Sequence, residues 1–130
     1  MAPSQRRPLS YVEQGRIRYL AEALGRPISL TDVSELPLIL ARLAIDYRAP
    51  IFFGEQVEVG TRVEWIGRTS FAMAHRLTAG DDAHPAAEVS TVLVSYDYAA
   101  ARPMPVPDDW RERLEAAEGR SLDRAAQGVA

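Results

Sequence analysis

An amphipathic stretch near the start of the chain constrains the possible folds more than any other part of the sequence. Leu9–Gly25, LSYVEQGRIRYLAEALG, is the only long helical pattern, and it precedes a region that alternates like β-strands. At about 100° per residue its main apolar side chains share one arc of roughly 160°, wide enough to face a sheet. The side chains on this arc are Leu9, Val12, Ile17, Tyr19, Leu20, Ala23 and Leu24. Pro8 suits the first helical position and Gly25 a left-handed C-cap, so the sequence predicts a helix packed on a sheet.

Two charged residues of this helix, Glu13 and Arg16, fall inside the apolar arc. Burying a charge costs several kcal/mol unless it is paired, and these two have opposite signs at i, i+3 spacing. The simpler interpretation is a pair in which each charge satisfies the other against the core. The functional interpretation is that Glu13 is a carboxylate placed in a cleft.

After the helix the apolar pattern changes to alternation, which is typical of β-strands. Pro37–Tyr47 is expected to be a strand largely buried on one face and partly on the other. Gln56–Ile66 is expected to be a strand with one solvent-exposed face and one core face, and the core face carries Val57, Val59, Val63 and Trp65. Ser70–Thr78 and Ala86–Tyr98 continue the alternation after short polar turns, so these three strands are predicted to form an antiparallel meander.

A proline-rich spacer follows the last strand and leads into a short amphipathic pattern. Asp108 is placed to cap a helix in which Trp110 and Leu114 meet at i, i+4 spacing. We expect residues 1–118 to form a single domain and residues 119–130 to be a flexible C-terminal tail.

Composition limits the function classes. A chain of 130 residues with 47% hydrophobic content can bury the core of one domain, and its net charge of −3 argues against nucleic acid or a membrane surface as a partner. The absence of cysteine excludes disulfides, thiolate metal sites and a cysteine nucleophile. With no apolar run near 18 residues, we expect a cytoplasmic protein.

One helix followed by four strands predicts the α+β class, with an antiparallel sheet that folds its apolar face around the helix. A four-stranded sheet leaves an edge strand that a second copy could cover, so we expect a homodimer. Another cone-shaped α+β fold, such as that of a small-molecule isomerase or polyketide cyclase, fits the same order of elements.

Three stretches together carry a resemblance to a known family. LSYVEQGRIRYL supplies a helix with Glu13 and Arg16, ARLAIDYRAPIFFGEQVEVGTRVEWIGRTSF supplies strands and a turn, and STVLVSYDYAAARPMPVPDDW supplies a last strand with a proline-flanked exit. In this order they resemble the hot-dog-fold thioesterases, specifically the 4-hydroxybenzoyl-CoA thioesterase-like group of acyl-CoA hydrolases. The resemblance runs from about Leu9 to Trp110 and implies a sheet wrapped around a central helix.

The resemblance also implies a site and an assembly. In such enzymes a homodimer or homotetramer binds acyl-CoA between protomers, with the thioester carbonyl at the amino end of the central helix. Glu13 is then the catalytic carboxylate that the helix offers. The residues expected to bind substrate or CoA are Tyr11, Asp46, Arg68, Thr69 and Ser70. Arg68 is alternatively an ordinary solvated turn residue, and neither a cofactor nor a metal is implied.

The chain departs from the family at its beginning. The family signature is an aspartate followed by Gly-His-Val-Asn-Asn after a first strand, and Met1–Gln5 occupies that place without matching it. The first strand and the usual catalytic aspartate therefore look absent. Either the reading starts at an internal methionine of a longer active thioesterase, or the chain is a variant, such as a non-catalytic module that binds an acyl thioester or serves as a dimeric scaffold.

The remaining candidates favour structural roles. His75 lies on the apolar face of its strand and is expected to be a core residue, while His84 precedes a proline in a polar turn. Two histidines without a carboxylate cluster at ligand spacing predict no metal site. No serine stands in a Gly-x-Ser-x-Gly elbow, which argues against a serine hydrolase.

Overall fold

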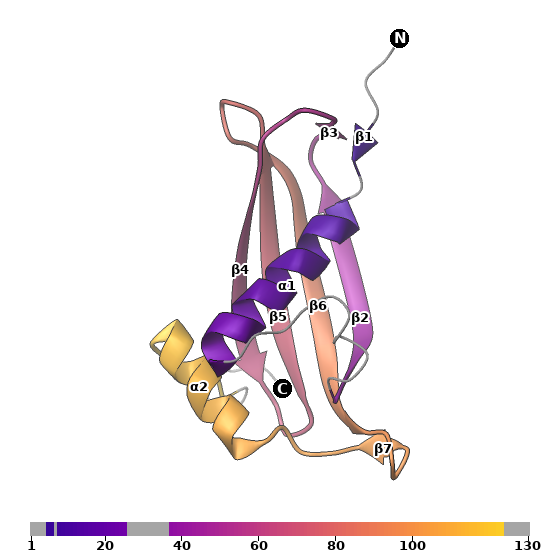
Figure 1. The fold of residues 1–130 in the computed structure, drawn as a ribbon, viewed down its shortest axis with the longest axis vertical. Helices are drawn as coiled ribbons and strands as arrows, with labels where there is room; N and C mark the ends of the chain where they lie inside the picture. Colours follow the sequence, from indigo (N-terminus) through magenta and orange to yellow (C-terminus); the bar gives the residue numbers. More distant parts are fainter. Residues whose placement is uncertain (1–4, 7, 26–36, 124–130) are drawn as a thin grey trace.

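The computed structural model describes residues 5–6, 8–25 and 37–123. Helix α1 (Pro8–Leu24) crosses one face of a sheet of four long antiparallel strands, which lie in the order β2-β6-β5-β4 (Figure 1). These strands are β2 (Leu38–Tyr47), β4 (Val57–Ile66), β5 (Ser70–Ala79) and β6 (His84–Asp97). The α+β class and the meander predicted from the sequence are both confirmed.

Helix α1 forms where its caps and apolar stripe predict. Pro8 is its first residue, and Gly25 follows it with φ +68°, the left-handed conformation that stops a helix. The amino half packs through Val12 on Leu77 and Ala79, and the carboxyl half packs through Leu20 on a second apolar cluster. The helix therefore begins at the end of the sheet where β5 finishes, and ends near the start of β5.

Strand β2 corrects one expectation, because none of its side chains is fully buried, although Leu38 and Ile45 pack against the two apolar clusters. Its neighbour β6 covers one edge, and the other edge has no partner in the described part of the chain. Leu40 is 45% exposed and Leu43 is 36% exposed, although both pair with core positions of β6. The alternation correctly predicts a strand, but burial of β2 requires a second neighbour, which the described part of the chain does not supply.

Of the three register shifts in the sheet, those in β2 and β4 change which of their side chains face the helix. A register shift between Leu40 and Arg42 in β2, and another between Val63 and Trp65 in β4, each add one residue to the strand. In β4 the shift turns Ile66 inward, where it is 1% exposed, and pairs Trp65 with Ala72 on the outer face. The expectation that Trp65 shares the core face with Val63 is therefore wrong.

The carboxyl-terminal segment is more ordered than expected. Helix α2 (Asp108–Glu118) buries Trp110 and Leu114 as predicted, but its N-cap is Pro107, so Asp108 lies inside the first turn and does not cap it. The segment from Gly119 to Asp123 is not frayed, because Leu122 is completely buried. Residues 124–130 lie outside the described residues.

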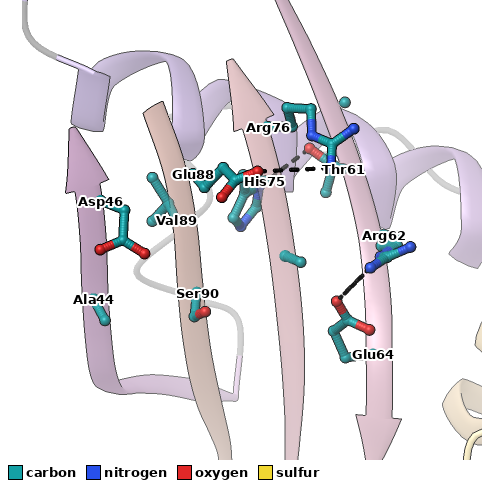
Figure 2. Close-up of a pocket in the computed structure, with 12 residues that line it drawn as sticks. Ala44, Asp46, Thr61, Arg62, Glu64, His75, Arg76, Glu88, Val89 and Ser90 are labelled. Atoms are coloured by element: carbon teal, nitrogen blue, oxygen red, sulfur yellow. Dashed lines mark hydrogen bonds and ion pairs between the residues drawn. The ribbon is translucent and has the colours of Figure 1, made fainter. Parts of the chain in front are cut away.

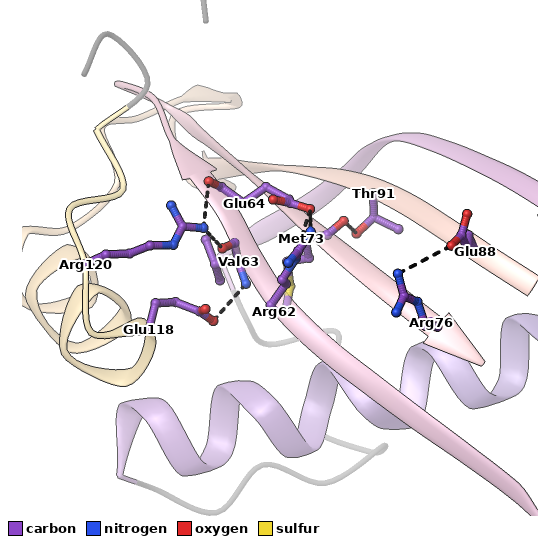
Figure 3. A network of polar contacts seen from close by, with 9 residues as sticks. All are labelled: Arg62, Val63, Glu64, Met73, Arg76, Glu88, Thr91, Glu118 and Arg120. Atoms are coloured by element: carbon purple, nitrogen blue, oxygen red, sulfur yellow. Dashed lines mark hydrogen bonds and ion pairs between the residues drawn. The ribbon is translucent and has the colours of Figure 1, made fainter. Parts of the chain in front are cut away.

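Polar contacts fix this segment to the edge of β4 (Figure 3). The Glu118 carboxylate accepts a hydrogen bond from the Val63 N–H at 3.0 Å, and the Arg120 guanidinium donates to the Val63 carbonyl at 3.1 Å. The Ile66 N–H donates to the Leu122 carbonyl at 2.7 Å. The side chains of Glu118 and Arg120, together with the backbone at Leu122, thus take the place of a neighbouring strand at this end of the edge.

Three short strands complete the fold. β1 (Gln5–Arg6) pairs with β3 (Ile51–Phe52), and β7 (Arg102–Pro103) pairs with the end of β6. A strand does precede the helix, but it has two residues and does not join the main sheet. Among the described residues, the long first strand of the family is therefore not seen.

Candidate active site

The amino end of α1 carries the electrostatic features expected of an oxyanion site. The N–H groups of Leu9 and Ser10 have no carbonyl acceptor within the helix, and both residues are exposed. The first turn contains no acidic side chain that would offset the positive end of the helix dipole. A developing negative charge near this end would therefore be stabilised.

Glu13 lies on the flank of α1 that faces away from β4. A Cβ atom at Gly15 would come within 2.8 Å of the Thr61 Oγ1 atom and 3.0 Å of the Val59 Cγ1 atom, which shows that this side of the helix contacts β4. Residues two apart on a helix are about 200° apart, so Glu13 projects from the opposite flank, toward β2. Its side chain is exposed there and accessible to a ligand.

The predicted buried pair of Glu13 and Arg16 is not formed. Glu13 is exposed, and the two side chains form no ion pair in the described part of the chain. Arg16 is half-buried, and burial lowers its pKa while the charge of Glu13 opposes that shift. The physical reason is that the apolar arc is wider than the buried stripe, so a short carboxylate on its edge reaches solvent.

A band of polar side chains crosses the sheet beneath α1 and separates the two apolar clusters. His75 is 2% exposed, its Nδ1 atom lies 3.1 Å from the Thr61 Oγ1 atom, and its Nε2 atom lies 3.4 Å from the Thr91 Oγ1 atom. Burial and the nearby charge of Arg16 lower the pKa of His75 to about 4, so the ring is neutral at pH 7. His75 is the satisfied core residue that its strand position predicted.

The threonines of this band were not identified from the sequence. Thr61 and Thr91 stand at positions where the alternation of β4 and β6 otherwise puts aliphatic residues on the core face. The sequence signal that could have identified them is a polar residue at a position where the alternation of the strand predicts an apolar one. It indicates that the core of this protein contains a hydrogen-bonded layer rather than a continuous apolar contact.

Two predicted binding residues, Tyr11 and Asp46, lie in different hollows. Tyr11 lines a groove of about 580 Å³ between α1 and β4. Asp46 lines a hollow of about 540 Å³ on the outer face of the sheet, opposite the helix (Figure 2). Neither hollow contains Glu13, so within one protomer these three residues do not form one site.

The predicted phosphate-binding turn lies at the far end of the sheet from the start of α1. Arg68, Thr69 and Ser70 connect β4 to β5, whereas α1 begins beside the end of β5 at Ala79. The Arg68 carbonyl accepts from the Val106 N–H and the Thr69 carbonyl accepts from the Ser95 N–H, so the backbone of this turn is fixed. The Arg68 side chain is exposed.

The fold and the comparisons together define the class of this protein. A sequence model of the thioesterase-like superfamily matches residues 4–114, and the sheet with one helix across it is the hot-dog architecture of that family. The chain belongs to the thioesterase-like superfamily. No curated protein matches the chain.

Solved structures support this assignment. A thioesterase from Thermus thermophilus, crystallised with coenzyme A and Zn, is 40% identical, with 88% of this chain and 79% of that chain covered and a TM-score of 0.73. A predicted thioesterase from Bacillus stearothermophilus is 23% identical over 88% of this chain and 79% of that chain, with a TM-score of 0.69. A DHNA-CoA thioesterase from Staphylococcus aureus is 22% identical over 94% of this chain and 80% of that chain, also with a TM-score of 0.69. The latter two show a shared fold.

Metal-binding clusters and membrane-spanning helices are both absent from the described residues. No three histidine, aspartate or glutamate side chains among them come together in a way that could hold a metal ion. Neither of the described helices has the length and apolar character needed to cross a bilayer.

Proposed function

We propose that this protein is a cytoplasmic acyl-CoA thioesterase that hydrolyses an acyl- or aroyl-CoA to the free acid and CoA. The observation that carries the proposal is the position of Glu13, which is exposed on the second turn of α1, beside a helix end that has no acidic residue of its own. The family assignment and the 40% identity to a thioesterase crystallised with coenzyme A support the same chemistry.

In this proposal Glu13 acts as a general base. Its carboxylate takes a proton from a water molecule as the oxygen attacks the thioester carbonyl, and N–H groups at the start of α1 stabilise the resulting oxyanion. When the tetrahedral intermediate collapses, the carbon–sulfur bond breaks and the thiolate of CoA takes the proton back from Glu13. The products are a carboxylic acid and CoA.

We place the substrate between two protomers that pair through their β2 edges. Leu40 and Leu43 expose apolar surface along that edge, on the side toward which Glu13 projects. Antiparallel pairing of β2 with its copy would bring the far end of one sheet beside the start of the partner's α1. The turn at Arg68, Thr69 and Ser70 of one protomer would then approach the helix end of the other, where hydroxyl and guanidinium groups suit CoA phosphates.

Thiol release from a panel of short, long and aromatic acyl-CoAs tests this function. Glu13→Gln should lower kcat by about 10²- to 10⁴-fold, the range for loss of a general base, with little change in KM. Glu22→Gln is the matched control, since it removes the same charge from another exposed position of α1 and should leave the rate unchanged. An unaltered kcat in Glu13→Gln would exclude the proposed role.

A second candidate is a non-catalytic module that binds an acyl thioester. It is favoured by one observation, that Glu13 lines neither hollow of the described residues and so does not share a site with Tyr11 or Asp46 within one protomer. Calorimetry with a non-hydrolysable acyl-CoA analogue separates the two candidates. Binding without any thiol release from the panel would support the module, and release that depends on Glu13 would exclude it.

A further inference from the structure

Exposed apolar side chains gather at the end of the molecule where α1 begins. Seven large hydrophobic side chains are exposed in the described part of the chain, and four of them form an apolar rim at this end. Leu9 belongs to the first turn of α1, Tyr47 ends β2, and Phe52 and Phe53 belong to β3 and the turn after it. Figure 1 shows β3 beside the start of α1, at the end of the sheet where β2 finishes. Apolar side chains that gather in this way mark a binding surface, whereas single exposed ones need no explanation.

Phe53 is the most exposed member of this apolar rim, at 70%, and it stands on a turn of defined conformation. The Glu55 N–H donates to the Phe52 carbonyl at 3.1 Å, and the Phe52 N–H donates to the Glu55 carboxylate at 2.7 Å. Gly54 has φ +93°, the positive value that a type II turn requires at its third residue. The turn therefore presents the phenyl ring to solvent in advance of binding, which lowers the entropy cost of a contact with it.

Two contacts fix the position of this turn relative to the start of α1. β3 pairs with β1, with Phe52 opposite Gln5, and α1 begins at Pro8, two residues after the end of β1. Ile51 is 1% exposed and lies in the same apolar cluster as Val12 of the second turn of α1. The apolar rim is therefore continuous with the candidate active site at the helix end.

The position of the apolar rim indicates which part of a substrate would meet it. In the proposed function the thioester carbonyl lies at the N–H groups that begin α1, and CoA extends from the sulfur toward the phosphate-binding turn of a second protomer. The acyl group leaves the carbonyl carbon on the other side. Hydrocarbon gains from contact with apolar side chains, since burial of one methylene is worth about fourfold in affinity, whereas a charged or polar acyl group gains nothing.

We infer that the apolar rim binds the hydrocarbon part of the acyl group, and that Phe53 sets a preference for acyl chains of medium length, such as hexanoyl, over acetyl. The inference rests on the proposed function, because it places the acyl group beside the helix end. Four side chains cover only a short length of hydrocarbon. The preference should therefore level off once the chain extends past them.

Thiol release along the series acetyl-, butyryl-, hexanoyl- and octanoyl-CoA tests this inference. In the parent protein kcat/KM should rise by about fourfold per methylene from acetyl to hexanoyl. Phe53→Ser removes the phenyl ring, so it should lower kcat/KM for hexanoyl-CoA by about tenfold more than for acetyl-CoA. Phe53→Leu keeps an apolar side chain and should retain most of the preference.

A control and two further readouts identify a purely structural role of the turn. Glu112→Ser shortens an exposed side chain on α2 and should leave the whole series unchanged. Far-UV circular dichroism and sedimentation velocity compare the fold and the mass of each variant with those of the parent. An equal loss for every acyl group in Phe53→Ser would mean that the turn supports the fold or a contact between copies, and would overturn the inference. An undiminished preference for hexanoyl-CoA in Phe53→Ser would overturn it as well.

Binding of S-alkyl-CoA thioethers separates this inference from the proposed function. These compounds cannot be hydrolysed, and calorimetry gives the dissociation constants of the ethyl, butyl and hexyl compounds for the parent and for Phe53→Ser. A parent protein that hydrolyses none of the acyl-CoAs would contradict the proposed function, while tighter binding of longer chains that Phe53→Ser removes would support the apolar rim. Binding that does not change with chain length would overturn the inference, whether or not the protein is a thioesterase.

Discussion

The buried imidazole of His75 couples the stability of the fold to pH. Its pKa in the folded protein is about 4, whereas the ordinary value is 6.5, because burial and the positive charge of Arg16 disfavour the protonated ring. The unfolded chain therefore binds more protons between these two values. The stabilisation is fully present above pH 6.5 and is lost as the pH falls toward 4.

We predict that the free energy of unfolding falls by about 2 kcal/mol between pH 7 and pH 5 through His75 alone. Urea titrations at the two pH values measure this loss. His75→Gln keeps a polar side chain between Thr61 and Thr91 but cannot titrate. The change in its free energy of unfolding between pH 7 and pH 5 should therefore be smaller than that of the parent protein by the same amount. Equal pH dependence in parent and variant would mean that another group carries it.

At the scale of residues, the sequence predicted the burial of His75 correctly and the burial of Glu13 wrongly. The histidine sits in the middle of an apolar face, where every neighbour in the alternation is buried, so its environment follows from the pattern alone. Glu13 lies within the helical arc but outside the stripe that the sheet covers, so its burial depends on how far the neighbouring strand extends. That distance is a property of the tertiary structure and is not encoded in helical periodicity.

Helix α1 can approach β4 closely because Gly15 has no side chain. The Thr61 Oγ1 atom that a Cβ would meet at 2.8 Å is held by the His75 ring, so it cannot rotate away without losing that hydrogen bond. We predict that Gly15→Ala destabilises the protein by about 1–3 kcal/mol, despite the better helix propensity of alanine. Thermal unfolding checks this, with Gln14→Ala as a solvent-side control that should be neutral or stabilising.

One carboxylate of helix α2, that of Glu118, joins the helix to two other elements of the fold (Figure 3). Glu118 accepts hydrogen bonds from the Tyr19 hydroxyl and from the Val63 N–H, and so joins α1, α2 and β4. Burial and the contact with this carboxylate both raise the pKa of Tyr19, which keeps its hydroxyl a donor. Glu118→Ala leaves two donors without their acceptor and should cost about 2 kcal/mol.

A double-mutant cycle with Tyr19→Phe isolates this contact. Because the two side chains share one hydrogen bond, the loss in the double variant should be smaller than the sum of the two single losses by about 1 kcal/mol. Chemical denaturation of the four proteins gives the coupling free energy. Strictly additive losses would show that Glu118 acts through Val63 alone.

At the scale of elements, the sequence predicted where helices and strands occur better than which way they face. The hairpin, the meander and the amphipathic face of α2 follow from local alternation and turn residues. The bulges near Ala41 and Glu64 do not, because an extra residue leaves the alternation of each half intact while exchanging its two faces. Leu122 was missed since a single apolar residue among polar ones shows no period.

At the scale of the whole molecule, the candidate active site is exposed to solvent on the side of β2. Glu13 and the start of α1 face the uncovered edge of β2, and the phosphate-binding candidates lie at the opposite end of the same sheet. A single protomer therefore cannot bring them together, whereas two protomers paired through β2 can. Under the proposed pairing, burial of β2 depends on a second chain rather than on the order of its own residues, so the sequence alone does not predict it.

This arrangement predicts that activity and association at the β2 edge are lost together. Leu43→Glu would place two unpaired carboxylates in the interface, and burying each costs about 3 kcal/mol or more, so the dissociation constant should rise by about 10⁴-fold or more. Sedimentation velocity at several concentrations measures the association, and thiol release at the same concentrations measures activity. Ala117→Glu adds the same charge at an exposed position of α2 and should change neither quantity. A folded Leu43→Glu monomer with the full rate per chain would place the entire catalytic site within one protomer and contradict a shared site.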